Sequence, residues 1–189
     1  KTRRVGAVFS SVARRYDVMN DLMSGGMHRL WKDRFVNRVK PRGGEQILDM
    51  AGGTGDVAFR MARRGANVTV ADINPDMLAV GMERARKQSV EGLIWAEENA
   101  EALSFADKSF DICFSNSVIE HVGDYADQQR MAQEIRRVGK RYFVQTPSKW
   151  FPLEPHFLFP FFAVLPHTAR RWLVQHFNLG WYRKIPDAQ

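Results

Sequence analysis

Several features are absent from the 189-residue sequence, and each absence narrows the class of protein. Because Cys113 is the single cysteine, an internal disulfide is excluded, which favours a reducing compartment. No window reaches the roughly 18 uninterrupted apolar residues of a membrane-spanning helix, and no secretory signal pattern opens the chain. The five histidines show no metal-ligand spacing, so we expect no metal site. These absences predict a cytoplasmic globular protein.

Positive charge is concentrated near the start of the chain. Residues 1–43 hold eleven Lys and Arg against three Asp, a net charge of +8, whereas the remainder is close to neutral. Such a segment suits acidic lipid headgroups at the inner membrane surface, or is a solvated helix face. We therefore expect peripheral membrane contact as one reading and no specific nucleic-acid partner. The oligomeric state stays open, a homo-oligomer included.

A strand, a glycine turn and a helix follow one another within residues 46–64. The apolar run ends at Asp49, and the turn that follows is rich in glycine. Glycines let backbone approach a ligand closely, and a helix that starts beyond such a turn directs its free N–H groups at the same space. The stretch therefore predicts a site for a polar, nucleotide-like ligand.

Beyond this stretch, strand and helix patterns alternate as a doubly wound parallel sheet requires. The predicted strands lie near 46–49, 68–72, 92–96, 110–115 and 141–146. The predicted helices lie near 55–64, 76–87 and 125–138, the second of them starting at Asn74-Pro75-Asp76. The pattern predicts an α/β fold with a mostly parallel, Rossmann-like sheet.

The segments on either side of residues 44–146 have a different character. Residues 1–43 predict two amphipathic helices, over 5–16 and from Met27 onward, that form a lid. Residues 147–189 are rich in aromatics and proline, belong to the same domain, and include a helix over 168–177 with Thr168 as its cap. No pair of further strands completes the sheet, so its C-terminal edge is expected to be truncated.

Two ligands compete for the glycine turn. Gly53 to Ala58 fits the dinucleotide form G-x-G-x-x-A, and Asp72 lies 17 residues beyond Gly55, near the position of a ribose-binding acid. Asp49, however, would repel a pyrophosphate and attract an ammonium group. S-Adenosylmethionine therefore fits better. The predicted cofactor contacts are Asp49, Gly52, Gly53, Thr54, Gly55, Asp72, Ile73, Met77, Asn99, Ala100 and Asn116.

Residues 5–112 resemble the UbiE/COQ5 family of ubiquinone and menaquinone biosynthesis C-methyltransferases. The matching stretches are VFSSVARRYDVMNDLMSGGMHRLWK (8–32), LDMAGGTGD (48–56), ADINPDMLAVG (71–81) and NAEALSFADKSFD (99–111). The resemblance implies a class I methyltransferase fold and an S-adenosylmethionine cofactor. It places cofactor contacts at Thr54, Asp72, Asn99, Ala100 and Asn116.

Beyond Asp111 the sequence departs from that family. A Phe-Gly-(Ile/Leu)-Arg-Asn-Val run is replaced by residues 117–122, and Glu120 reverses the charge of the arginine. Residues 115–122 and 141–147 are instead similar to another group of bacterial class I methyltransferases. The chain is therefore interpreted as a mosaic of two methyltransferases joined near the fourth strand.

Methylation of a hydroquinone carbon needs alignment of the two reactants and a base for the phenol. His121, after the fourth strand, is the first candidate base, and Tyr16 and His28 on the N-terminal helices are the second. Aromatic residues 150–162 suit an apolar acceptor or a membrane surface. We expect a methyltransferase that acts on a quinol precursor. The alternatives are a methyltransferase of another small-molecule class, a silent cofactor-binding scaffold and an NAD-dependent dehydrogenase.

Overall fold

A computed structural model describes residues 27–146, 153–154, 159–160 and 162–178 of the chain. The chain divides into two compact units, residues 1–146 and 147–189. The first unit contains the glycine turn and the sheet that follows it. That residues 147–189 belong to the same domain stays a prediction.

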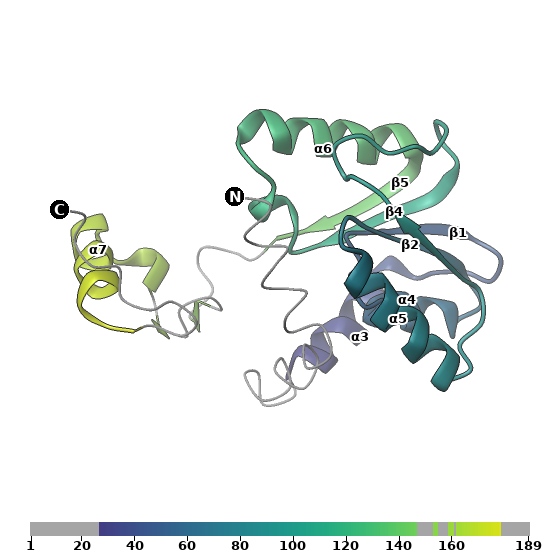
Figure 1. The fold of residues 1–189 in the computed structure, drawn as a ribbon, viewed down its shortest axis with the longest axis horizontal. Helices are drawn as coiled ribbons and strands as arrows, with labels where there is room; N and C mark the ends of the chain where they lie inside the picture. The colour runs from purple at the N-terminus through teal and green to yellow at the C-terminus, as the bar shows by residue number, and fades with distance from the viewer. Residues whose placement is uncertain (1–26, 147–152, 155–158, 161, 179–189) are drawn as a thin grey trace. The chain divides into compact units, whose positions relative to one another are not determined.

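Five parallel strands form one sheet in the order β3-β2-β1-β4-β5 (Figure 1). The strands are β1 (Gln46–Met50), β2 (Asn67–Asp72), β3 (Leu93–Glu97), β4 (Phe110–Asn116) and β5 (Gly139–Gln145). The strand order reverses between β1 and β4, and open α/β sheets bind ligands beyond the carboxyl ends of the strands at such a point. The predicted α/β fold with a parallel sheet is confirmed.

Helices cover both faces of this sheet (Figure 1). On one face lie α3 (Met27–Val39), α4 (Asp56–Ala62) and α5 (Pro75–Lys87), and on the other lies α6 (Tyr125–Val138). The first face buries Val36, Val57, Met61, Leu78, Val68 and Val70. The second face buries Met131, Ile135, Val138, Leu48 and Cys113.

Local sequence explains where the best-defined helices begin. The Asn74 side chain accepts hydrogen bonds from the backbone N–H groups of Asp76 and Met77, and Pro75 occupies the first turn of α5, as predicted. Asp124 and Asp127 form a reciprocal capping box at the start of α6. Because these side chains satisfy backbone donors that the helix leaves free, they set the helix starts.

The observed elements lie within a few residues of the predicted ones. The fifth strand begins two residues earlier than expected, at Gly139, and the first helix of the core ends at Ala62. The predicted helix over 5–16 lies outside the described residues, whereas the one expected from Met27 is α3. The turn of 3₁₀ helix η2 (Ile119–His121) was not predicted.

The second unit contains a two-residue antiparallel pair, β6 (Leu153–Glu154) and β7 (Phe159–Pro160), which forms a sheet of its own. It also contains the 3₁₀ turn η3 (Phe162–Val164) and the helix α7 (His167–His176). The helix follows Pro166, with no side-chain cap, so the prediction that Thr168 is the cap is wrong. Among the residues with a described structure, no helix is long and apolar enough to cross a membrane.

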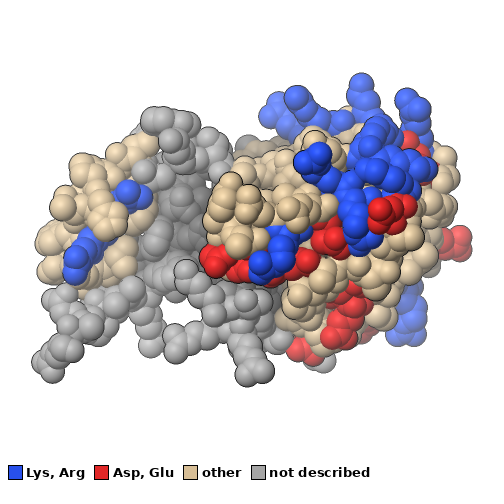
Figure 2. All heavy atoms as spheres, turned by 90° about the horizontal axis from the view of Figure 1, so that it is seen from above, with Lys and Arg blue, Asp and Glu red and all other residues tan. Residues whose placement is uncertain are grey.

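Many basic side chains outside the N-terminal segment are paired with acids. Figure 2 looks onto the α6 side and shows Lys and Arg gathered together with Asp and Glu. Near the end of α6, Arg137 Nη2 lies 2.7 Å from Glu134 Oε2, and Lys140 Nζ lies 2.8 Å from Asp111 Oδ1. On the described part of this surface, positive side chains therefore lie beside negative ones and do not form a separate basic patch.

Candidate functional site

Polar side chains share one face at the carboxyl ends of four neighbouring strands. The core under α3, α4 and α5 receives Ile47, Val70, Phe114 and Phe143 from these four strands. Successive side chains of a strand alternate between faces. The residues two positions further along therefore lie on that same face: Asp49, Asp72, Asn116 and Gln145. This edge, at the reversal of strand order, is the candidate site.

The carboxylate of Asp72 holds the glycine turn through backbone groups. Its Oδ2 accepts from the Gly53 N–H at 2.9 Å, and its Oδ1 accepts from the Asn74 N–H at 2.8 Å. Gly53 and Gly55 have φ angles of 58° and 74°, which favour glycine. A Cβ on Gly53 would lie 3.1 Å from Met77 Cε, so the turn packs closely on Met77. Asp72, the turn and Met77 are thus brought together, as predicted.

Asp49 is a buried carboxylate directly beneath the turn. Its side chain is 3% exposed, and its Oδ2 has no hydrogen-bond partner in the part of the chain that the structure describes. A Cβ on Gly52 would lie 2.9 Å from that oxygen. Burial and then the nearby Asp72 raise the pKa of Asp49 to about 7, although the Ala58 backbone N–H opposes the shift. A cationic ligand group at this oxygen would stabilise the ionised form.

The rest of the turn is fixed from α5 and β3. The buried Thr54 hydroxyl accepts a hydrogen bond from Arg84 Nη1 at 2.9 Å. A Cβ on Gly55 would lie 2.7 Å from Trp95 Cη2, so this position has no room for a side chain. Thr54 therefore helps to hold the turn against α5, and its contact with a cofactor stays a prediction.

Three predicted contacts lie on the loops after β2 and β3. Ile73 is exposed beyond the end of β2. Asn99 is exposed after β3, and its Oδ1 accepts from the Glu101 backbone N–H at 3.0 Å. Ala100 packs against the core on the α6 side. Since parallel strands end at one edge of the sheet, these loops belong to the candidate site.

Asn116 and Gln145 are direct partners across β4 and β5. Asn116 Oδ1 and Gln145 Oε1 are buried and have no hydrogen-bond partner among the described residues. The rings of Phe114 and Phe143, two positions earlier on each strand, stack with centroids 5.8 Å apart. Two amide groups therefore stand beside an apolar floor. Sequence reasoning missed Gln145, although its place at the end of the fifth strand was the available signal.

The candidate bases are placed less fully. His121 is exposed in η2, which follows β4, whereas both carboxylate oxygens of Glu120 are buried and have no hydrogen-bond partner within the described ranges. Tyr16 lies outside the described residues. His28 belongs to the first turn of α3, but its side chain lies outside what the structure describes. The roles of all three as bases stay predictions.

The described residues contain no group of three or more His, Cys, Asp or Glu that could hold a metal ion. The site at the strand ends offers Asp49 Oδ2 and the oxygens of Asn116 and Gln145, which have no hydrogen-bond partner among the described residues, together with the glycine turn. They suit an organic ligand with a cationic group and hydroxyl groups.

The model of the ubiE/COQ5 methyltransferase family matches residues 1–174. The chain belongs to this family. The match runs well past Asp111, where the sequence resemblance was expected to stop. One family therefore covers both sides of the expected junction, and the mosaic interpretation is not confirmed. Membership in the family also confirms S-adenosylmethionine as the cofactor and favours it over a dinucleotide.

Two curated relatives are ubiquinone/menaquinone biosynthesis C-methyltransferases. That of Zymomonas mobilis is 55% identical over 155 residues, which are 79% of this chain and 63% of the relative. That of Paracoccus denitrificans is 46% identical over 183 residues, which are 95% of this chain and 67% of the relative. The chain therefore spans about 60% of the length of the Zymomonas mobilis relative.

A solved structure has the same fold. It is a phosphoethanolamine N-methyltransferase of Haemonchus contortus in complex with S-adenosyl-L-methionine. It is 25% identical with a TM-score of 0.53, covering 61% of this chain and 27% of that one. The class I methyltransferase fold that the sequence predicted is thereby confirmed.

Proposed function

We propose that the chain carries the donor half, and part of the acceptor half, of an S-adenosylmethionine-dependent C-methyltransferase that acts on a quinol precursor of ubiquinone or menaquinone. The observation that carries this proposal is the buried Asp49 Oδ2, which has no hydrogen-bond partner among the described residues and lies beneath the glycine turn of a ubiE/COQ5 family member. The bound cofactor would supply an electrophilic methyl group, which a ring carbon of the quinol would take up while it releases a proton to water.

The donor side is argued from charge and backbone. Asp49 offers a buried negative charge to a cationic cofactor, and Asp72 keeps lone pairs for ribose hydroxyls while it holds the turn. Gly52 and Gly53 let the cofactor approach the backbone. Because these groups are set before the cofactor binds, they contribute alignment of the methyl carbon, which is the main requirement of an in-line displacement.

The acceptor side is argued from Asn116 and Gln145. Their buried carbonyl oxygens accept hydrogen bonds from hydroxyl groups of the ring, and the stacked Phe114 and Phe143 rings suit its apolar face. In this proposal His121 is the base that removes the phenolic proton, which contributes about 10²–10⁴-fold to the rate. Tyr16 and His28 are further candidates for the same task.

Peripheral contact with a membrane surface fits an apolar acceptor. On α3, Leu30 is 60% exposed and Trp31 is 38% exposed, next to Arg34 and within the basic N-terminal segment. Exposed aromatic and apolar side chains beside basic ones suit the interface of an anionic membrane. The proposal therefore places the reaction in the cytoplasm at the inner membrane surface.

Calorimetric titration with S-adenosylmethionine and with NAD tests the cofactor. Binding of the first alone supports the proposal, and binding of NAD alone contradicts it. The reaction is tested by incubating the chain with labelled cofactor and a demethylated quinol extract. Label in the quinol supports methyl transfer, whereas cofactor binding without transfer favours a scaffold.

His121 is tested by its replacement with alanine. If it is the base, kcat falls by about 10²-fold or more, while cofactor affinity stays unchanged. The exposed His167 of α7, replaced in the same way, is the matched control. An unchanged kcat in the His121→Ala protein would remove His121 from the mechanism.

A further inference from the structure

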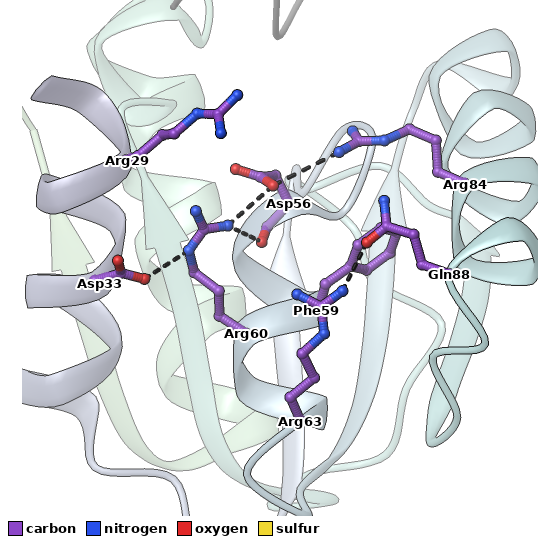
Figure 3. A pocket seen from close by; sticks show the side chains of 8 residues that line it. All are labelled: Arg29, Asp33, Asp56, Phe59, Arg60, Arg63, Arg84 and Gln88. Atoms are coloured by element: carbon purple, nitrogen blue, oxygen red, sulfur yellow. Dashed lines mark hydrogen bonds and ion pairs between the residues drawn. The ribbon is translucent and has the colours of Figure 1, made fainter. Parts of the chain in front are cut away.

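Apart from the candidate site, a pocket of about 380 Å³ lies between α3, α4 and α5 (Figure 3). It is lined by Arg29 and Asp33 of α3, Arg60 of α4, Arg63 just after α4, and Arg84 of α5. None of these residues belongs to the predicted cofactor or acceptor contacts. A liquid water molecule takes up about 30 Å³, so the pocket has room for a ligand of about ten non-hydrogen atoms.

The acidic side chains of the pocket are outnumbered by the basic ones around them. Asp56 faces three cations: Lys32 Nζ at 2.7 Å, Arg60 Nη1 at 3.0 Å and Arg84 Nη2 at 3.6 Å. Arg60 also reaches Asp33, with Nε 2.8 Å from Oδ1. Burial raises the pKa of Asp56, but the three cations lower it by more. The pKa therefore lies below its ordinary value, and the carboxylate stays ionised. Even with both aspartates charged, the cluster keeps a net positive charge.

The positive charge of Arg63 is not neutralised by its hydrogen-bond partner, Gln88, which is uncharged. Its Nη2 donates to Gln88 Oε1 at 2.6 Å, and Figure 3 shows the two side chains meeting at the opposite end of the pocket from Asp56. An amide oxygen accepts the hydrogen bond without neutralising the guanidinium. Guanidinium groups match phosphate oxygens in geometry and carry charge for them.

Phe59 forms an apolar floor that positions one of the arginines. The ring is 2% exposed, and the Arg84 guanidinium carbon lies 5.4 Å from its centroid. Stacking of this kind restricts the guanidinium plane. The pocket thus combines a restrained guanidinium group, excess positive charge and a partly open hollow.

We propose that this pocket binds the phosphate group of a small phosphate ester of the size of glycerol phosphate. The ester is either the headgroup of an acidic phospholipid or a free soluble molecule. The site is separate from methyl transfer, so its test uses binding and not activity.

In the test, the whole chain is titrated at low ionic strength with glycerol phosphate and with inorganic phosphate, and calorimetry measures the binding. Arg63→Gln is expected to weaken binding about tenfold, because it removes one charged donor. Arg64→Gln is the matched control. Arg64 is the next residue, donates to Asn37 Oδ1, and does not line the pocket. If both variants weaken phosphate binding equally, the binding depends only on the overall surface charge, and the proposal is overturned.

A variant with the opposite expected effect guards against simple misfolding. Asp33→Asn removes a negative charge from the pocket and leaves Arg60 paired with Asp56 alone, so phosphate should bind several-fold more tightly. Asp107→Asn makes the same change in charge at an acid that pairs with Arg137, outside the pocket. A gain confined to Asp33→Asn supports the site, and no gain contradicts it.

Vesicles separate the two sources of the phosphate. Phosphatidylcholine vesicles with and without phosphatidylglycerol are sedimented with the wild-type chain and the Arg63→Gln chain. Binding that needs both phosphatidylglycerol and Arg63 assigns the site to a headgroup. Arg63-dependent binding of glycerol phosphate alone assigns it to a soluble ester. If neither ligand depends on Arg63, the proposal fails.

Discussion

The Gly53 backbone N–H donates to Asp72 Oδ2 at 2.9 Å, and this bond joins the turn after β1 to the end of the neighbouring strand β2. The other oxygen of the same carboxylate accepts from the Asn74 N–H just before α5. One side chain therefore holds both loops that flank the predicted cofactor, and the shape of the turn depends on it.

Replacement of Asp72 by asparagine tests this bond. Because an amide has one acceptor oxygen, one of the two backbone N–H groups loses its partner, which costs about 1–3 kcal/mol of unfolding free energy. We also expect S-adenosylmethionine to bind at least tenfold more weakly, as measured by calorimetry beside urea denaturation. Asp76→Asn, an exposed change on α5, is the control, and an equal effect there would refute the role of Asp72.

Replacement of Gly55 by alanine tests the tight turn. The residue has a φ of 74°, and its added Cβ would lie 2.7 Å from Trp95 Cη2. A left-handed backbone costs about 1–2 kcal/mol and overpacking about 1–3 kcal/mol, so the unfolding free energy should fall by about 2–5 kcal/mol. Gly43→Ala, where nothing lies within 4 Å, should leave the urea midpoint nearly unchanged. A tolerated Gly55→Ala would contradict the packing described for the turn.

Cofactor affinity should depend on pH through Asp49. Its pKa in the free protein is about 7, and a cationic cofactor lowers it because the ionised form is then stabilised. Affinity should therefore rise by up to about tenfold per pH unit from pH 5 to 7 and level off above. Calorimetry across this range measures the slope, and Asp49→Asn should abolish it. A slope that persists in the variant would assign the titration to another group.

The same carboxyl group should affect stability without cofactor. Folding raises the pKa of Asp49 from its ordinary value of 3.8 to about 7, so its stabilising contribution is fully present below about pH 4. It is lost as the pH rises to about 7, because the folded state binds the proton more tightly than the unfolded state. Urea denaturation should show Asp49→Asn to be more stable than the wild type at pH 8.

Gln145 should affect the acceptor and not the cofactor. Gln145→Met keeps the length of the side chain and removes the carbonyl oxygen that is buried without a partner. The KM for the quinol should rise about 3- to 10-fold, the value of one neutral hydrogen bond, while cofactor affinity stays constant. Gln133→Met on the exposed face of α6 is the control. A loss of cofactor affinity in Gln145→Met would place this residue on the donor side.

The alternation of strands and helices, the glycine turn and the partners Asp49 and Asp72 could all be derived from sequence. These features depend on local patterns: the period of apolar residues, the capping by Asn74 and Pro75, and glycines in positions that need positive φ. The family resemblance over residues 5–112 also pointed to the cofactor. Even the boundaries of β1 and α5 were predicted within one residue.

Tertiary structure alone decided which side chains meet. The pairing of Asn116 with Gln145 follows from the adjacency of β4 and β5. The hydrogen bond from Arg84 to Thr54 joins residues 30 positions apart. The basic pocket takes side chains from three helices. Burial likewise left Asp49 Oδ2 without a hydrogen-bond partner among the residues that the structure describes. Such relationships depend on sheet order and helix packing, so local sequence patterns established which groups the chain offers and the fold established which of them act together.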